Sequence, residues 1–223
     1  MKATMTLITI AATAFAASAS VTSFTENFES GANNWLSGSH APLTWNATGA
    51  LDGSAYVSSS ADLNAAGPFG LTLFRGESNQ NASAGAFVGN YLASGITTIE
   101  FDFRHDAGID LGIALRVSGP FNFPGFGVEQ PTLIASGQWV RLSYDLSFFN
   151  PLLTLETFPP TPDFYNSVME AVGNIQVSSF RPDGLTTPLI ANFDLDNISI
   201  VPAPGSIAIL GLGCLTASRR RRN

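Results

Sequence analysis

The feature that most constrains the fold is a set of short segments in which apolar and polar side chains alternate. In residues 96–104, Ile99, Phe101 and Phe103 share one face, and charged residues occupy the other. Because successive side chains of a β-strand point to opposite faces, this period of two predicts a strand with one buried face. The same alternation occurs in two further segments, residues 111–118 and 138–146.

Further short apolar segments continue this pattern and are separated by Gly, Pro and Asn turns. They lie at residues 22–28, 50–57, 70–74, 86–91, 174–180 and 191–201. Only residues 163–172 favour a helix, with Asp163 as its N-terminal cap, and residues 119–127 and 151–162 are expected to be irregular. Short strands with so little helix predict an all-β chain folded as an antiparallel β-sandwich of the jelly-roll type.

The N-terminal residues have the order of a secretory signal peptide. Lys2 provides a charged start, residues 5–17 are mostly apolar, and a small-x-small cleavage site follows at residues 17–19. We therefore expect residues 1–19 to form a signal helix that signal peptidase removes. A single β-sandwich domain then spans residues 20–200, a suitable length for one domain.

The C-terminal residues 201–223 consist of three parts. These are a proline motif (Val201, Pro202, Ala203, Pro204), an apolar run (residues 207–217) and a basic cluster (Arg219, Arg220, Arg221, Arg222). The prolines prevent a strand or helix from continuing. The apolar run has about half of the roughly 20 residues that span a bilayer, and arginines after it favour the cytoplasmic side. This order predicts a short apolar helix that inserts transiently into a membrane.

The same three-part order resembles the PEP-CTERM sorting signal of Gram-negative and related bacteria. Residues 201–204 stand in the position of its Val-Pro-Glu-Pro-like motif, with Ala203 in place of the usual Glu. The resemblance implies recognition and cleavage by an exosortase, transit through the inner membrane, and delivery to the cell surface or extracellular matrix. The alternative is an ordinary tail anchor, or a terminal strand with a basic end.

The charge balance narrows the classes of partner. Of the ten basic residues only five lie between the two targeting segments, whereas all seventeen acidic residues do, which gives this part of the chain a formal charge of −12. Such a surface argues against nucleic acid or anionic lipid as a partner and is compatible with divalent cations and neutral sugars. The single cysteine, Cys214, lies in the tail, so the predicted domain has no disulfide.

The predicted domain also resembles, at its two edges, the β-jelly-roll domains of carbohydrate-binding modules. The matching segments are residues 27–31 (Asn-Phe-Glu-Ser-Gly), with Trp35 soon after, residues 52–57 (Asp-Gly-Ser-Ala-Tyr-Val) and residues 193–200. In that family the opening Glu and an Asp of the last strand lie side by side and often bind a structural calcium ion. The resemblance implies Glu29, Asp52 and Asp196 as calcium ligands, and calcium prefers oxygen ligands of this kind. The alternative is that these acids are solvated.

Aromatic residues are candidates for binding sugar, because their faces cover the apolar surface of a sugar ring. The candidates are Trp35, Trp45 and Trp139, together with Tyr56. Trp139 shares strand parity with charged residues, which favours an exposed face, but packing in the core is the alternative for all of them. Three further aromatic residues, Phe121, Phe123 and Phe126, are expected either under the sandwich or on an exposed patch.

A group of charged residues near the predicted strand 96–104 offers an enzymatic alternative. The group consists of Glu100, Asp102, Arg104, His105, Asp106 and Asp110. Two of its acids would serve as a glycosidase pair, whereas the simpler interpretation is a solvated strand face with Arg104 as counter-ion. The sequence has no Gly-x-Ser-x-Gly, no His-Glu-x-x-His and no phosphate-binding glycine-rich loop.

These observations predict an exported, non-catalytic β-sandwich that binds or organises extracellular polysaccharide. Two alternatives stay open at this point. One is a purely structural envelope or matrix protein, and the other is a glycoside hydrolase or lyase built on the same sandwich. A fold by itself does not choose among them, since function depends on the site.

Overall fold

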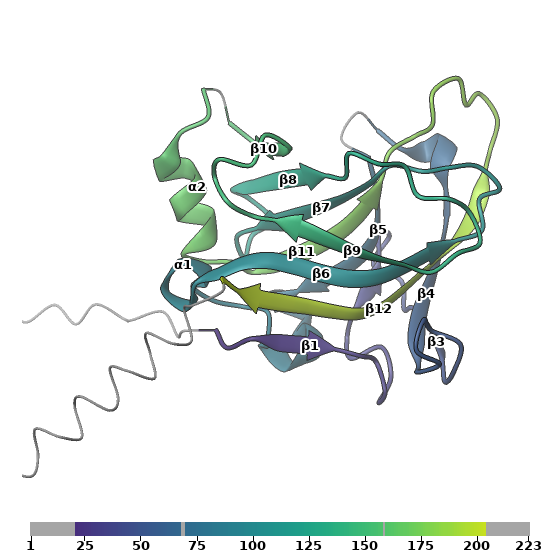
Figure 1. Cartoon of the computed structure of the whole chain (residues 1–223), viewed down its shortest axis with the longest axis horizontal. Coiled ribbons are helices and arrows are strands. Elements are labelled where there is room, and N and C mark those ends of the chain that lie inside the picture. The colour runs from purple at the N-terminus through teal and green to yellow at the C-terminus, as the bar shows by residue number, and fades with distance from the viewer. Residues whose placement is uncertain (1–20, 68–69, 158, 204–223) are drawn as a thin grey trace, which may run out of the picture.

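Two antiparallel β-sheets pack face to face in the computed structural model, which describes residues 21–67, 70–157 and 159–203 (Figure 1). The first, here called the β12 sheet, has the strand order β3-β4-β12-β6-β9, and β1 also pairs with β12. The second, the β11 sheet, has the order β10-β8-β7-β11-β5-β2. This arrangement confirms the predicted all-β antiparallel sandwich of the jelly-roll type.

Each sheet is assembled from strands that are distant in the sequence. The β12 sheet consists of β1 (Phe24–Glu26), β3 (Thr44–Asn46), β4 (Tyr56–Asp62), β6 (Ile96–His105), β9 (Val140–Asp145) and β12 (Ile190–Pro202). The β11 sheet consists of β2 (Leu36–Ser37), β5 (Leu71–Glu77), β7 (Ile113–Ser118), β8 (Gly125–Glu129), β10 (Leu153–Leu155) and β11 (Asn174–Ser179). The helical elements are α1 (Tyr91–Ser94), α2 (Pro162–Met169) and the 3-10 turns η1 (Leu63–Ala65), η2 (Ser78–Gln80) and η3 (Ala82–Gly85).

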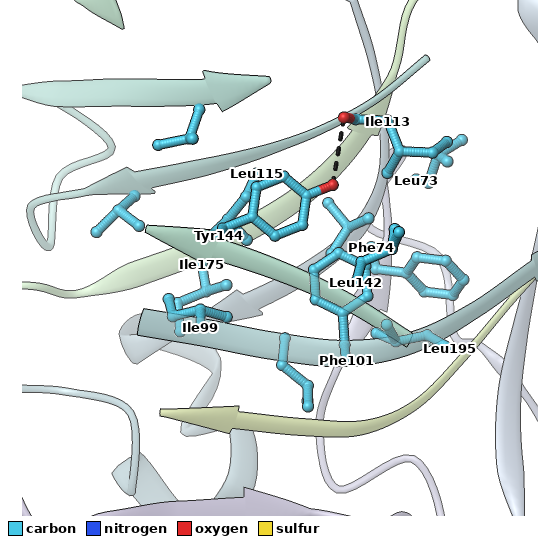
Figure 2. Close-up of a cluster of buried hydrophobic side chains, with 14 of the residues drawn as sticks. Leu73, Phe74, Ile99, Phe101, Ile113, Leu115, Leu142, Tyr144, Ile175 and Leu195 are labelled. Atoms are coloured by element: carbon cyan, nitrogen blue, oxygen red, sulfur yellow. Dashed lines mark hydrogen bonds between the residues drawn. The ribbon is translucent and has the colours of Figure 1, made fainter. Parts of the chain in front are cut away.

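The core between the sheets is built from the alternating side chains of these strands. Ile99, Phe101 and Phe103 of β6 are all fully buried, which confirms the predicted parity. Within the same sheet, Tyr144 of the neighbouring strand β9 stacks on Phe101 with ring centroids 5.3 Å apart. The Tyr144 hydroxyl donates a hydrogen bond of 3.2 Å to the carbonyl of Ile113, and thereby links the two sheets (Figure 2).

Four local predictions were wrong. Residues 86–91 were expected to be a strand, but they form a turn that leads into helix α1 (Tyr91–Ser94). The helix caps at Thr161, whose hydroxyl oxygen accepts a hydrogen bond from the Phe164 amide at 3.2 Å, so Asp163 lies in the first turn and is not the cap. Gly125–Glu129 is a strand although it was expected to be an irregular loop. Leu153–Leu155 also forms a strand, because it pairs with β8 at the sheet edge.

The first and last strands are neighbours, as predicted. Phe24 of β1 pairs with Ile200 of β12, and β12 ends at Pro202, the second residue of the proline motif. The predicted signal helix and apolar tail helix lie outside the described residues, as do Pro204 and Arg219 to Arg222. Within the described ranges, no helix is long and apolar enough to cross a membrane.

Candidate functional site

The predicted calcium ligands meet around one turn, residues 52–55. The Ser54 hydroxyl, which has one proton to donate, lies within hydrogen-bond distance of Oδ1 of Asp52 and, at 3.0 Å, of Oδ2 of Asp196. The Ala55 amide donates to Oε1 of Glu29 at 3.3 Å. Antiparallel pairing of β4 and β12 brings the turn that precedes β4 to Asp196, so the fold places all three acids within reach of residues 54 and 55.

Asp196 is the unusual member of this group, because its carboxylate is completely buried. It sits at a bulge in the pairing of β12 with β6, where Asn197 has a left-handed φ of 49°. Asn197 Nδ2 donates to Oδ2 of Asp196 at 3.0 Å, whereas Oδ1 of Asp196 has no hydrogen-bond partner among the described residues. Burial, with smaller contributions from the charges of Asp52 and Asp102, raises the Asp196 pKa to about 6.

The arrangement fits a cation only in part. No group of three or more Asp, Glu, His or Cys side chains in the described part of the chain is placed to hold a metal ion, so Glu29, Asp52 and Asp196 do not form the expected carboxylate set. Glu29 and Asp52 are exposed, and Asp52 already accepts from the Ser54 amide at 2.9 Å. The unpaired oxygen of Asp196 is nevertheless an acceptor that a hard cation would satisfy, and calcium takes hydroxyl and carbonyl oxygens besides carboxylates.

The three tryptophans do not form a common platform. Trp35 is 1% exposed and packs edge-on against Phe28 and Phe87, and its indole N–H donates to Ser83 Oγ at 2.8 Å. The prediction of Trp35 as a sugar-stacking residue was therefore wrong, because the core covers both of its faces. Trp45 on β3 is 44% exposed and donates to the Phe28 carbonyl at 2.7 Å.

Trp139 lies on the outer face of the β12 sheet, as its strand parity predicted. Its ring meets that of Tyr56 edge-on with centroids 5.4 Å apart, and the Arg104 guanidinium lies 4.8 Å from the Trp139 ring. Arg104 Nε also donates to Oδ2 of Asp194 at 2.7 Å. Arg104 already occupies one face of the indole, so Trp139 is half-buried in a packed cluster.

The acids considered as a glycosidase pair have structural partners. Glu100 and Asp102 both accept hydrogen bonds of 3.2 Å from Arg141, so they act as counter-ions of one guanidinium. His105 is 1% exposed, and its Nε2 lies 3.0 Å from the Ile134 carbonyl. Asp106 accepts from the Asn192 backbone amide and side chain, both at 2.7 Å. These contacts agree with the simpler interpretation of this group.

A hollow that sequence reasoning did not find lies on the outer face of the β11 sheet. It has a volume of about 610 Å³, within the usual range for ligand sites. Most of the residues that line it are polar, but apolar atoms form the larger part of its exposed wall, and Phe121 of the β7–β8 loop is 93% exposed. The residues that line it are His40, Arg75, Glu77, Ser78, Asn79, Pro120, Phe121, Asn122 and Asn174. We call this hollow the polar groove.

On one side of the polar groove, the carboxylate of Glu77 lies between the side chains of Arg75 and His40. Arg75 Nη1 donates to Oε1 of Glu77 at 3.0 Å, and His40 Nε2 lies 3.2 Å from Oε2. Arg75 Nε also donates to the Gly38 carbonyl at 3.1 Å. Glu77 is 5% exposed, so its partners fix it in place and it cannot swing toward a ligand.

Arg116 holds the other side and fixes the β7–β8 loop. Its Nη2 donates to the Asn122 carbonyl at 2.6 Å and to Glu156 Oε2 at 2.8 Å. Asn174 and Gln176 of β11 also contact this loop. Asn174 Nδ2 donates to the Gly119 carbonyl at 2.6 Å, and Gln176 Nε2 donates to Oδ1 of Asn122 at 2.9 Å. The loop that carries Phe121 is thus anchored from the floor of the sheet.

The signal that would have revealed this site is the strand of residues 174–179. Its polar side chains Asn174, Gln176 and Ser178 alternate with the core residues Ile175 and Val177, yet all of them are buried. A polar strand face that is covered by loops is typical of a groove. Alternation in the sequence shows only which face of the strand is polar, and it does not show what covers that face. Likewise, Glu26 and not Glu29 is the buried acid near the first strand.

Comparison with known proteins gives likenesses in fold. No protein-family model matches the chain, and no curated protein matches it. Among solved structures, the chain is similar to the family 11 carbohydrate-binding module from Clostridium thermocellum in complex with a β-1,3-1,4-mixed-linked tetrasaccharide. The TM-score is 0.47 at 16% identity, over 83% of this chain and 98% of that one.

Two other solved structures are also similar to the chain. One is the C-terminal family 22 carbohydrate-binding module of Clostridium thermocellum Xyn10B, with a TM-score of 0.42 at 14% identity over 81% of this chain and 94% of that one. The other is the L4b domain of human laminin α-2, with a TM-score of 0.40 at 11% identity over 73% of this chain and 98% of that one. By its own strand order, the described chain is an antiparallel β-sandwich of the jelly-roll type.

Proposed function

We propose that this protein is an exported, non-catalytic module that binds neutral polysaccharide in the polar groove. The observation that carries the proposal is the groove itself, in which fixed amide, guanidinium and carboxylate groups surround one exposed ring, Phe121. Sugar hydroxyls pair with such polar groups, and the ring covers the apolar face of a sugar. Since the groups are already anchored, little ordering is needed when a glycan binds.

The carboxylate that lines the groove supports binding without catalysis. Glu77 lies between Arg75 and His40, and Glu156, which lies outside the groove lining, is paired with Arg116. A glycosidase needs one carboxyl group that donates a proton and a second that acts as nucleophile or base. Both carboxylates act instead as counter-ions of arginine, so neither is free for these roles.

A glycan array with two matched variants tests the proposal. Phe121 and Phe149 are similarly exposed, at 93% and 90%, but only Phe121 lines the polar groove. We expect Phe121→Ala to weaken binding of a neutral glycan about tenfold, which corresponds to about 1.4 kcal/mol, and Phe149→Ala to leave it unchanged. Equal effects of both variants, or no binding of any neutral glycan, would contradict the proposal. A loss confined to Trp45→Ala would place the sugar on the other sheet.

We further propose a structural calcium ion held by Asp196. Asp52 and the Ser54 hydroxyl would lie around the ion beside Asp196. Glu29, from the segment that opens the domain, lies nearby. The buried Oδ1 of Asp196, which lacks a hydrogen-bond partner within the part of the chain that the structure describes, supports this proposal. When bound, the ion would neutralise the acids beside Asp196 and join the start of β4 to β12, so its role would be stability.

The cellular location of the protein is proposed from its two terminal segments. The signal peptide of residues 1–19 directs export through signal peptidase, and the tail of residues 201–223 is inserted in the inner membrane and then cleaved by an exosortase. The released module would remain at the cell surface or in the matrix. In a host that encodes an exosortase, replacement of Pro202 and Pro204 by Ala should leave the tail uncleaved, as intact-mass spectrometry would show. Continued cleavage of this variant would contradict the sorting proposal.

A further inference from the structure

One end of the sandwich carries large apolar side chains in solvent. This end, here called the tail-side end, comprises α1, α2, and the loops that follow β7 and β9 (Figure 1). Phe149 is 90% exposed, Phe123 is 60% exposed, and Leu92 of α1 is 39% exposed. These residues come from three separate segments, so the tertiary structure brings them to a common end.

The exposed rings rest on α2 and are held in position. The Phe123 ring meets Phe164 of α2 with centroids 6.1 Å apart. Phe149 packs edge-on against Phe148 at 5.4 Å, and Phe148 in turn contacts Tyr165 of α2 at 5.5 Å. A backbone pair between Gly89 and Val172 fastens the segment before α1 to the segment after α2. The tail-side end is thus a supported apolar surface.

The C-terminal tail leaves from this same end. The Ala203 amide donates to the carbonyl of Gly95, the residue that caps α1, at 2.8 Å. The apolar run begins four positions later, at Ile207. Four residues reach at most about 14 Å when fully extended. If the run lies in a bilayer, the tail-side end therefore lies within about 14 Å of it.

We propose that the tail-side end docks on the surface of the bilayer, with Phe149 and Phe123 entering the headgroup region. The proposal rests on the proposed insertion of the tail. The part of the chain between the targeting segments has five basic and seventeen acidic residues, so the contact is apolar and favours a zwitterionic lipid over an anionic one. The short tether and the supported rings single out a lipid surface as the occupant.

Fluorescence quenching in vesicles tests this docking with the full chain. Phe149→Trp or Phe123→Trp places a new indole at the tail-side end, and Ile190→Trp serves as the matched control. Ile190 is 72% exposed and begins β12, about 40 Å along the strand from Pro202. Each variant is reconstituted into phosphatidylcholine vesicles with and without brominated acyl chains, and the fluorescence of the unsubstituted chain is subtracted. We expect the two tail-side indoles to lose about half or more of their emission, since interfacial side chains lie within reach of the acyl boundary, and the control to lose none.

Flotation of the same vesicles separates the two proposals. If the chain floats with the vesicles but the tail-side indoles are not quenched, docking is wrong while insertion of the tail stands. If the chain does not float, insertion fails and docking fails with it. If the indoles at positions 123 and 149 shift to shorter wavelength without lipid and the chain sediments as a dimer, a second copy covers the surface and the lipid proposal is overturned.

Discussion

The Ser54 hydroxyl and Asp196 Oδ2 are 3.0 Å apart although 142 positions separate the two residues. The contact joins the turn that precedes β4 to the last strand. It satisfies one oxygen of a buried carboxylate, and none of the residues in the described ranges donates a hydrogen bond to the other oxygen. A buried carboxylate with one unpaired oxygen destabilises the fold when it is ionised. A bound cation, or protonation of the carboxyl group, would remove this cost.

Calcium should stabilise the chain through Asp196. In thermal unfolding at pH 7, we expect calcium at about 100 times its dissociation constant to add about 2.7 kcal/mol relative to EDTA. Asp196→Asn should lose this gain, because the amide removes the charge that attracts the ion. Asp110→Asn, which removes the charge of an exposed acid elsewhere, should keep it. An unchanged calcium gain in Asp196→Asn would exclude Asp196 as the ligand.

Without calcium, stability should depend on pH through the same carboxyl group. Its pKa is raised to about 6 in the fold from an ordinary value of 3.8, so between these values the folded state binds more protons than the unfolded state. Stability therefore falls as pH rises from about 4 to 7, by up to about 3 kcal/mol. Asp196→Asn removes this contribution. The measurement is the difference in unfolding free energy between the two chains in EDTA across this range, and a constant difference would contradict the expectation.

Gly76→Ala should destabilise the core at Trp35. A Cβ at position 76 would lie 2.5 Å from the Trp35 ring, and the ring is held by its bond to Ser83. We expect a loss of about 1–3 kcal/mol in urea unfolding, as for other overpacked sites. Gly127→Ala is the matched control, because it is also in a strand but its new Cβ would lie 3.9 Å from the nearest atom. Similar losses for the two variants would mean that backbone effects, and not the Trp35 contact, determine the cost.

Arg104 and Trp139 should be energetically coupled and should not take part in sugar binding. The guanidinium lies 4.8 Å from the indole, and cation–π contacts at partly exposed sites are worth about 0.5–1 kcal/mol. A double-mutant cycle of Arg104→Ala and Trp139→Ala should return a coupling of that size. The pair Arg104→Ala and Phe149→Ala, at opposite ends of the sandwich, should be additive. Loss of glycan binding in Trp139→Ala would show that the cluster, and not the polar groove, is the sugar site.

The sequence alone determined the class of fold and much of the core. The parity of Ile99, Phe101 and Phe103 identified the buried face of β6, because strand geometry fixes which side chains share a face. It also indicated that Trp139 faces outward. Boundaries were less reliable, since β8 and β10 depend on pairing with each other and with neighbours, and such pairing leaves little trace in a segment rich in Gly and Pro.

Only the tertiary structure decided which of these residues form sites. The sequence gives no means of telling Trp35 from Trp45, yet the fold buries Trp35 and leaves Trp45 exposed. Loops also cover the polar face of β11 and thereby form the groove. The pairing of β4 with β12 carries Ser54 to Asp196, and the bulge at Asn197 determines how Asp196 is placed. Alternation along a chain specifies the face on which a side chain lies, whereas contacts between distant strands and loops decide what covers that face.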